Sequence, residues 1–322
     1  MQTFYPPIKT YAEHRLPVES PHEIYIAECG NPEGLPVLIV HSGPGAGCQK
    51  FHRRYFDPRY FRIILFDQRG CGQSTPYAEL TNNNTQALIS DMEAIREHLN
   101  IRRWVLFGGA WGSTLSMLYA QQYPEHVHSM VLRGVFLGRK RDIDWMYHSG
   151  ASKIFPDYWN DFIEQFDENE RNDLISAYCE RLTGNDQLAQ MAAAKSWSLW
   201  QARTSALQPH STIMEHFSDP HFAVGLARIE SHFFKQHCFI EDNQILDNIG
   251  RIQNIPAYIV HGRYDIVCPL DAAWTLHRAW PNSQLYIVRD AGHAENEPGI
   301  IDALIYATKK IMKNDRDYSA PA

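Results

Sequence analysis

The fold of this chain is decided by the stretch Val105-Leu106-Phe107-Gly108-Gly109-Ala110-Trp111-Gly112-Ser113, which reads as an apolar strand, a glycine-flanked turn and the start of a helix. In the pattern Gly-x-Ser-x-Gly a serine occupies a strained turn between strand and helix, and the glycines let the backbone pass close to its neighbours. Gly108 and Gly112 stand where that pattern has glycine, but Ala110 stands where it has serine. The spacing therefore predicts the scaffold of an enzyme that lacks its reactive oxygen.

The size and composition of the chain narrow the class of protein. Its 322 residues exceed the usual size of a single core, so we expect one large α/β domain with an insertion, or two domains. A hydrophobic content of 44% supports a sizeable core. The net charge is -7 and the basic residues are scattered, which predicts no nucleic-acid partner because such a partner calls for a clustered basic face.

The sequence also argues against membrane and metal partners. The start of the chain lacks the charged and apolar regions of a signal peptide, and no later run is long and apolar enough to span a bilayer. The six cysteines include no Cys-x-x-Cys pair, and no histidines have the spacing of zinc ligands. We therefore expect a soluble protein of the reducing cytoplasm with no metal and no cofactor.

Apolar runs before residues 105–113, which we call the elbow, predict strands that end in glycine-rich loops. Residues 23–29 and 37–41 predict the opening strands, joined by a hairpin turn over residues 30–34. The second strand leads into the loop 41–47, whose glycines allow close approach of backbone amides to a ligand. This loop is therefore a candidate oxyanion hole, with a plain Gly-Pro turn as the alternative.

Strand and helix patterns alternate on both sides of the elbow. An apolar run over 61–66 predicts a strand, and apolar residues at helical spacing predict a helix over 88–99. After the elbow, residues 115–123 predict a buried helix and residues 127–134 the next strand. Such alternation implies a mostly parallel sheet that is covered by helices on both faces.

The alternation stops between Phe136 and Asn254, where only helical patterns are present. They cover residues 158–166, 170–182, 187–207 and 221–236. We therefore expect an inserted helical cap over residues 136–253 and an α/β core formed by residues 1–135 and 254–322.

The last part of the chain supplies two candidate catalytic residues. Asp265 follows a predicted strand over 257–261, and His293 follows a predicted strand over 284–288. Position 110, Asp265 and His293 stand in the order of nucleophile, acid and histidine found in α/β hydrolases. Each follows the carboxyl end of a strand, and these ends meet at one edge of a parallel sheet, so we expect the three to converge.

The chain resembles the prolyl aminopeptidase family, also called proline iminopeptidases, of the α/β-hydrolase superfamily. Besides the elbow, the motifs that carry the resemblance are Tyr5-Pro6-Pro7-Ile8, His41-Ser42-Gly43-Pro44-Gly45, Asp67-Gln68-Arg69-Gly70-Cys71-Gly72, Val131-Leu132-Arg133-Gly134, Ala227-Arg228-Ile229-Glu230, and His261-Gly262-Arg263-Tyr264-Asp265 with Cys268-Pro269. The resemblance covers nearly the whole chain. It implies an α/β-hydrolase fold and removal of an N-terminal proline from a small peptide or amino-acyl amide through an acyl-enzyme, without metal or organic cofactor.

The resemblance also implies roles for the catalytic positions. A serine at position 110 would attack the carbonyl carbon, His293 would accept and return its proton, and Asp265 would orient the imidazole. The backbone amides of Gly43 and Trp111 would bind the oxyanion.

Further residues are implied around the substrate. Glu230 matches a family glutamate that binds the substrate amine, with a solvated helix charge as the alternative. Phe136, Arg133 and Tyr147 match residues around the proline pocket, although Phe136 and Tyr147 are also what the core of a cap would contain.

Three departures from the family pattern bear on this reading. The family has Trp-x-x-Trp-Glu where this chain has Trp197-Ser198-Leu199-Trp200-Gln201, so a second amine-binding carboxylate is replaced by a neutral amide. This loses a charge-assisted hydrogen bond of about 1 kcal/mol or more and predicts relaxed recognition of the amine. Ala294 replaces the usual serine after the histidine. Ala110 is the largest departure.

Several interpretations of the chain follow. We favour an inactivating Ser-to-Ala change, engineered into a working hydrolase, because the partners Asp265 and His293 are kept. The alternatives are a natural protein that lost catalysis and kept a binding pocket, and an esterase or amidase acting on another small amine-bearing substrate. The oligomeric state is left open.

Overall fold

The computed structural model describes residues 1–208 and 211–319. Within them the chain forms one eight-stranded sheet with the strand order β1-β2-β4-β3-β5-β6-β7-β8. The strands are β1 (Thr10–Pro17), β2 (Glu23–Gly30), β3 (Leu35–Val40), β4 (Phe61–Phe66), β5 (Trp104–Gly109), β6 (Val127–Arg133), β7 (Ala257–Gly262) and β8 (Ser283–Val288). Strands β1, β2 and β4 pair antiparallel, and every pairing from β4 to β8 is parallel. The predicted α/β fold with a mostly parallel sheet is therefore confirmed.

Helices cover both faces of the sheet because the central strands are apolar on both sides. In β3, Leu38 and Val40 join the core beneath α1 and α2, whereas Val37 and Ile39 join the core beneath α12. The helices that pack on the sheet are α1 (Thr85–His98), α2 (Trp111–Gln122), α11 (Leu270–Ala279) and α12 (Pro298–Ser319). Two cores thus sandwich the sheet, as period-two alternation in a buried strand requires.

One prediction about the sheet is wrong. The turn over residues 30–34 joins β2 to β3, but the two strands do not form a hairpin, since β4 lies between them. β4 pairs antiparallel with β2 and parallel with β3. The edge strand β1 was not predicted either, because its residues alternate between half-buried and exposed and it lacks an apolar run.

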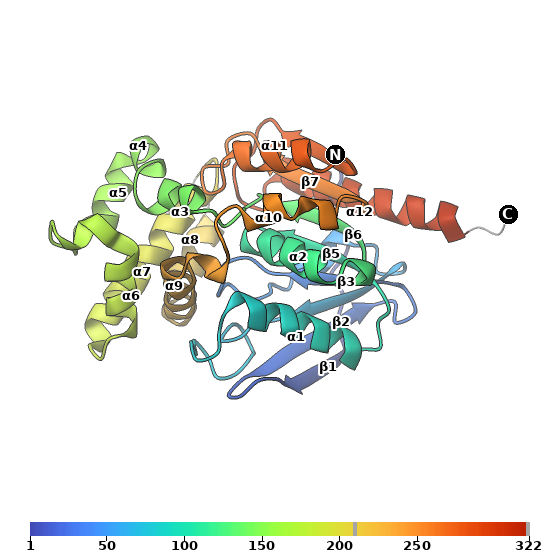
Figure 1. Ribbon diagram of the computed structural model, residues 1–322, viewed down its shortest axis with the longest axis horizontal. Helices are drawn as coiled ribbons and strands as arrows, with labels where there is room; N and C mark the ends of the chain where they lie inside the picture. The colour runs from blue at the N-terminus through green and yellow to red at the C-terminus, as the bar shows by residue number, and fades with distance from the viewer. Residues whose placement is uncertain (209–210, 320–322) are drawn as a thin grey trace.

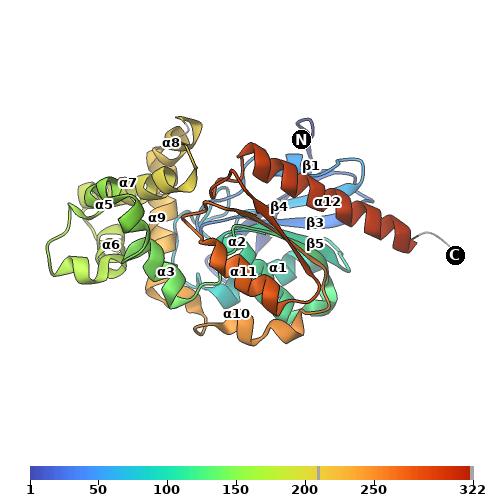
Figure 2. The same cartoon turned by 90° about the horizontal axis from the view of Figure 1, so that it is seen from above.

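Between β6 and β7 the described chain forms helices and no strand. They are α3 (Lys140–Tyr147), α4 (Ala151–Ile154), α5 (Pro156–Ile163), α6 (Leu174–Thr183), α7 (Gln187–Ser205), α8 (Ser211–Phe217), α9 (Pro220–Lys235) and α10 (Gln244–Asp247), with short 3-10 turns at Glu170–Asp173, His237–Phe239 and Ile249–Arg251. Figures 1 and 2 show α3 to α9 gathered beside the sheet, at one end of the molecule. We call α3 to α9 the helical insertion. α10 packs instead on α2, where Gln121 Nε2 donates to the carbonyl of Ile245 at 2.8 Å.

Local sequence signals place the long helices of the insertion. An aspartate caps the first turn of each, with Asp173 accepting from the Ser176 amide, Asp186 from the Leu188 and Ala189 amides, and Asp219 from the Phe222 amide. Such caps contribute about 1 kcal/mol each because they satisfy amides that have no partner within the helix. The helices α7 and α9 pack on each other, and both carry residues that line the cavity described below.

No helix in residues 1–208 and 211–319 combines the length and the apolar character needed to cross a bilayer.

Candidate active site

The elbow forms the turn that its glycines predict. Ala110 lies between β5 and α2 with φ +48° and ψ -119°, a conformation that a residue with a side chain rarely adopts. A Cβ atom on Gly108 would lie 2.3 Å from the Gly112 carbonyl oxygen, and one on Gly112 would lie 2.0 Å from the Val40 carbonyl oxygen. Both positions therefore require glycine, and the side chain at position 110 faces the cavity described below.

Asp265 and His293 meet beside the elbow. His293 Nδ1 lies 2.8 Å and 3.0 Å from the two carboxylate oxygens of Asp265, and Oδ1 also accepts from the Cys268 amide at 2.8 Å. Burial opposes the charge of Asp265, but the attraction and hydrogen bond of His293 and the attraction of His261 outweigh it and lower the pKa of Asp265. A neutral imidazole that donates from Nδ1 to this carboxylate has its lone pair at Nε2.

Arg133, the last residue of β6, binds the other side of His293. Its guanidinium donates to the His293 carbonyl at 2.8 Å and approaches His293 Nε2 at 3.2 Å. Its other end lies 3.5 Å from Glu295 Oε2, and Glu295 Oε1 lies 2.9 Å from His52 Nε2. Burial opposes the charge of Glu295, but His52 and Arg133 overcome this and lower the pKa of Glu295 to about 2.

Glu295 and His52 lie at the site but were not predicted from the sequence. Glu295 stands two residues after His293, which is a signal that it lies near the site. His52 stands on a 3-10 turn, His52–Tyr55, that no local pattern connects with the last loop. These two residues are 243 positions apart, so only the folded sheet brings them together.

The candidate oxyanion hole lies between the loop 41–47 and the start of α2. Gly43 has φ +112°, and a Cβ there would lie 2.5 Å from the Gly45 nitrogen. Within the described chain, neither the Gly43 nor the Trp111 amide N–H has a hydrogen-bond partner. The indole of Trp111 donates to Gln68 Oε1 at 3.0 Å, and Gln68 Nε2 donates to the His41 carbonyl at 3.0 Å, which ties the loop to the helix. Two free amides are thus available for an anionic oxygen.

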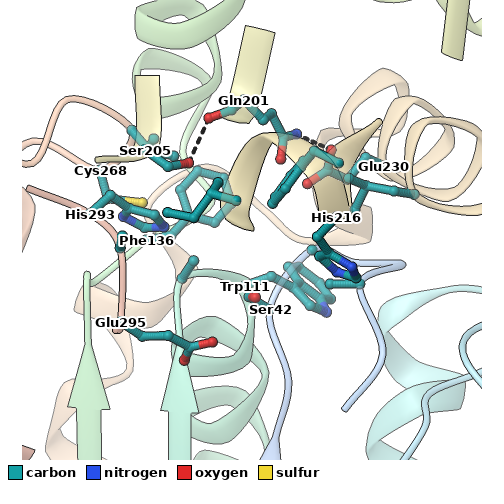
Figure 3. A pocket seen from close by; sticks show the side chains of 18 of the residues that line it. Ser42, Trp111, Phe136, Gln201, Ser205, His216, Glu230, Cys268, His293 and Glu295 are labelled. Atoms are coloured by element: carbon teal, nitrogen blue, oxygen red, sulfur yellow. Dashed lines mark hydrogen bonds between the residues drawn. The ribbon is translucent and has the colours of Figure 1, made fainter. Parts of the chain in front are cut away.

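A buried carboxyl group occupies the side of the site formed by the insertion. Glu230 on α9 is 3% exposed, and its Oε2 accepts from Trp197 Nε1 at 2.7 Å and from Gln201 Nε2. Gln201 Nε2 also donates to the Tyr147 hydroxyl at 3.0 Å. Burial raises the pKa of Glu230 to about 8, although the hydrogen bonds from Trp197 and Gln201 act against this shift. Figure 3 shows Gln201 bonded to Glu230, with His293 on the opposite side.

One cavity of about 370 Å³ joins these groups. Nine of the ten predicted site residues line it, and Asp265 lies behind His293. Its wall includes the aromatic rings of Phe136, Tyr147 and Phe234, and the Tyr147 ring stacks on Trp197 with centroids 4.5 Å apart. The arrangement offers an imidazole and free amides at one end, a carboxylate at the other, and an apolar space between them.

No metal site accompanies this cavity in the described part of the chain. Within those residues no three His, Cys, Asp or Glu side chains are grouped so that they could hold an ion.

Comparisons with known proteins identify the family of this chain. The profile of the alpha/beta hydrolase fold family matches residues 36–298. The chain is 49% identical to the proline iminopeptidase of Xylella fastidiosa strain 9a5c over 313 residues, which cover 97% of this chain and 100% of that protein. It is 46% identical to the proline iminopeptidase of Arabidopsis thaliana, and the match covers 96% of this chain and 82% of that protein. The chain belongs to the proline iminopeptidase family.

Solved structures of other α/β hydrolases support the fold alone. A bromoperoxidase from Bacillus anthracis matches with a TM-score of 0.66 and 18% identity, over 94% of this chain and 100% of that one. A membrane phospholipase A matches with a TM-score of 0.66 and 16% identity, over 94% of this chain and 87% of that one. These proteins share the α/β-hydrolase fold with this chain, whose buried Glu230 is contributed by helix α9 of the insertion.

Proposed function

We propose that this chain binds the N-terminal residue of a small peptide or amino-acyl amide, and that its scaffold is that of a serine-type prolyl aminopeptidase. The observation that carries the proposal is the His293–Asp265 pair beside the elbow, in one cavity with the buried carboxylate of Glu230. The free N-terminal amine of the substrate would bind Glu230 and Gln201. Its scissile carbonyl would then lie between position 110 and the amides of Gly43 and Trp111. The high identity to proteins named proline iminopeptidase supports the same substrate class.

The proposed mechanism needs a hydroxyl at position 110. The serine oxygen would attack the carbonyl carbon while its proton passes to His293 Nε2, and the amides of Gly43 and Trp111 would donate to the resulting oxyanion. Collapse would break the C–N bond, and the imidazolium would protonate the leaving amine. Water, deprotonated by His293, would then hydrolyse the ester. Each oxyanion donor in comparable enzymes contributes about 3 kcal/mol to transition-state stabilisation.

With Ala110 the first step has no nucleophile, so we propose that the chain binds substrates of this class without acylation. Ser113 does not replace the missing group, since its hydroxyl donates to the Ala110 carbonyl at 2.6 Å and is buried in α2. We propose an engineered Ser-to-Ala change as the origin of Ala110. Natural loss of catalysis, with retention of a binding pocket, is the alternative proposal.

The proposal extends to the setting of the protein. All six cysteines are free thiols, and five of them are buried, which supports a reducing compartment such as the cytoplasm. We propose that residues 136–253 act as the cap domain over residues 1–135 and 254–322. The pocket walls contributed by α3, α7, α8 and α9 support this division.

Restoring the hydroxyl tests the proposed function. We expect Ala110→Ser to release the chromophore from L-proline arylamide at a rate at least about a thousandfold above the parent chain, because the nucleophile and its base are then both present. Chromophore release is measured together with active-site labelling by a fluorophosphonate.

The control is Ala110→Ser combined with His293→Ala, which keeps the hydroxyl and removes the base. A folded Ala110→Ser protein that cleaves no aminoacyl amide or ester from a broad panel would contradict the enzyme assignment and favour a binding protein. Cleavage of esters alone, or of amides without a free amine, would instead favour the esterase or amidase alternative.

A further inference from the structure

Arg133 lies at the catalytic end of the cavity with part of its hydrogen-bonding capacity unused. The residue is 4% exposed and lines the cavity. One terminal nitrogen donates to the His293 carbonyl and approaches His293 Nε2, as described above. Within the described chain its Nε has no partner. Its closest carboxylate oxygen, on Glu295, is 3.5 Å away, which is longer than a charge-assisted hydrogen bond of about 2.8 Å.

Glu295 is not free to move onto Arg133, because it is held elsewhere. Its Oε1 bonds His52 at 2.9 Å, and the Tyr55 hydroxyl donates to its backbone carbonyl at 2.7 Å. The guanidinium is therefore buried, charged and incompletely neutralised at short range. A planar guanidinium binds carboxylates better than neutral carbonyl groups, because two charge-assisted hydrogen bonds can form side by side.

A second feature of the same end also favours an anion. Gly43 and Trp111, whose amides have no partner within the described residues, line the cavity together with Ala110, and Trp111 begins the 12-residue helix α2, whose dipole is positive at that end. A hydroxyl at position 110 would fill part of this space. The methyl group of Ala110 leaves it open. Arg133, Gly43 and Trp111 all line the same cavity, which therefore offers a guanidinium and two amides to an anion.

The other end of the cavity selects a cationic amine through Glu230 and Gln201. The N-terminal residue of a peptide and a free amino acid have the same span from the amine nitrogen to the carbonyl carbon. A site that holds one between Glu230 and position 110 also holds the other. The two ligands differ at the carbonyl, where a peptide has a neutral amide and a free amino acid has a carboxylate.

We infer that the cavity of the chain with Ala110 binds a free α-amino acid as its zwitterion. The amino acid has a small apolar side chain or a pyrrolidine ring. The ammonium binds Glu230 and Gln201, the ring or side chain packs against Phe136, and the carboxylate binds Arg133 with the amides of Gly43 and Trp111. This inference rests on the proposed function, because it takes the position of the amine from it. It adds that the chain prefers the acid to the corresponding amide.

Calorimetric titration of the full chain with L-proline, L-prolinamide and N-acetyl-L-proline tests the inference. We expect L-proline to bind at least about tenfold more tightly than L-prolinamide, since only the acid offers a charge-assisted partner to Arg133. N-acetyl-L-proline, which lacks the cationic amine, binds more weakly than either. Equal or tighter binding of L-prolinamide by the parent chain would overturn the inference.

Two variants separate Arg133 from its neighbour. Arg133→Met keeps an unbranched apolar side chain and removes the charge, so the preference for the acid is lost. Glu295→Gln removes the competing carboxylate and keeps Arg133, so the preference for the acid increases. Because Glu295→Gln leaves the guanidinium of Arg133 in place, it tests whether Arg133 binds the ligand carboxylate even where Arg133→Met does not fold. An unchanged ratio of affinities in Glu295→Gln would contradict the role of Arg133.

The outcomes also separate the inference from the proposed function. Cleavage of prolyl arylamide by Ala110→Ser, together with no preference for L-proline in the parent chain, overturns the inference alone. Tight binding of N-acetyl-L-proline overturns the amine site and with it both proposals. Tight binding of L-proline by the parent chain, with no cleavage by Ala110→Ser, supports the inference as a statement about a binding protein.

Discussion

At the residue scale, the proposed recognition of an amine depends on Gln201. Both hydrogens of its amide nitrogen are used, one on Glu230 and one on the Tyr147 hydroxyl. Its carbonyl oxygen therefore remains as the acceptor for a ligand. A secondary ammonium such as that of an N-terminal proline has two N–H donors, which match one oxygen of Glu230 and the oxygen of Gln201. The pair supplies two acceptors but only one ionisable carboxyl, so under the proposed function we expect a neutral polar group to be excluded less strictly than it would be by two carboxylates.

We expect Gln201→Glu to sharpen this recognition. In the Ala110→Ser background, the ratio of kcat/KM for a free-amine substrate to that for its N-acetyl analogue rises by about tenfold, because a second charge-assisted acceptor favours the ammonium by about 1 kcal/mol or more. Gln201→Met, of similar length and without hydrogen-bonding groups, is the matched control and lowers the ratio. An absolute requirement for the free amine already in Ala110→Ser alone would show that Gln201 does not relax recognition.

At the scale of elements, the turn between β5 and α2 keeps a strained backbone conformation at Ala110. Ala110 keeps φ +48° although its side chain performs no nucleophilic chemistry. Such a conformation costs a residue with a Cβ atom about 1 to 3 kcal/mol. The tight packing of Gly108, Gly112 and Val40 imposes it, since β3, β5 and α2 approach too closely there for another turn.

We therefore expect Ala110→Gly to increase the free energy of unfolding by about 1 kcal/mol. Glycine relieves the strain, and this gain exceeds the greater entropy of glycine in the unfolded chain. Ala120→Gly is the matched control, because Ala120 is fully buried in α2 with ordinary helical neighbours. It should lower the free energy of unfolding by about 1 kcal/mol or more. Urea denaturation followed by circular dichroism measures both, and a destabilised Ala110→Gly would show that the turn is not strained.

The elements also show what could be predicted from the sequence. Buried strands such as β5 and β7 are continuous apolar runs, and the residues that follow parallel strands share one edge of the sheet. Position 110, Asp265 and His293 could therefore be placed together without a structure. The pairing of β4 with β2 and β3 could not, because no local pattern records which strand lies between two others. The contact of Glu295 with His52 depends on the same long-range arrangement.

At the scale of the whole molecule, the pKa values of two carboxyl groups that line one cavity are shifted in opposite directions, so they affect stability in opposite pH ranges. Burial in the insertion raises the pKa of Glu230 to about 8, whereas His52 and Arg133 lower the pKa of Glu295 to about 2 against the effect of burial. Both start from an ordinary value of 4.5. The folded protein therefore holds a proton on Glu230 that the unfolded chain releases above that value, and it has lost a proton from Glu295 that the unfolded chain still binds below it.

These shifts fix the sign of each group's contribution to stability. The contribution of Glu230 is complete below pH 4.5 and is lost as the pH rises to about 8, while that of Glu295 is complete above pH 4.5 and is lost as the pH falls to about 2. Relative to the parent chain, Glu230→Gln should become more stable between about pH 5 and pH 8, by about 3 kcal/mol at the upper end.

Glu295→Gln should be less stable by about 2 kcal/mol near pH 7 and should approach the parent in acid. Glu33→Gln, on an exposed turn, is the control. Urea unfolding across this pH range measures the free energy of unfolding of all four proteins. A Glu230→Gln curve that runs parallel to that of the parent would mean that Glu230 is ionised in the empty cavity. The ammonium of a ligand would then bind without releasing a proton from Glu230.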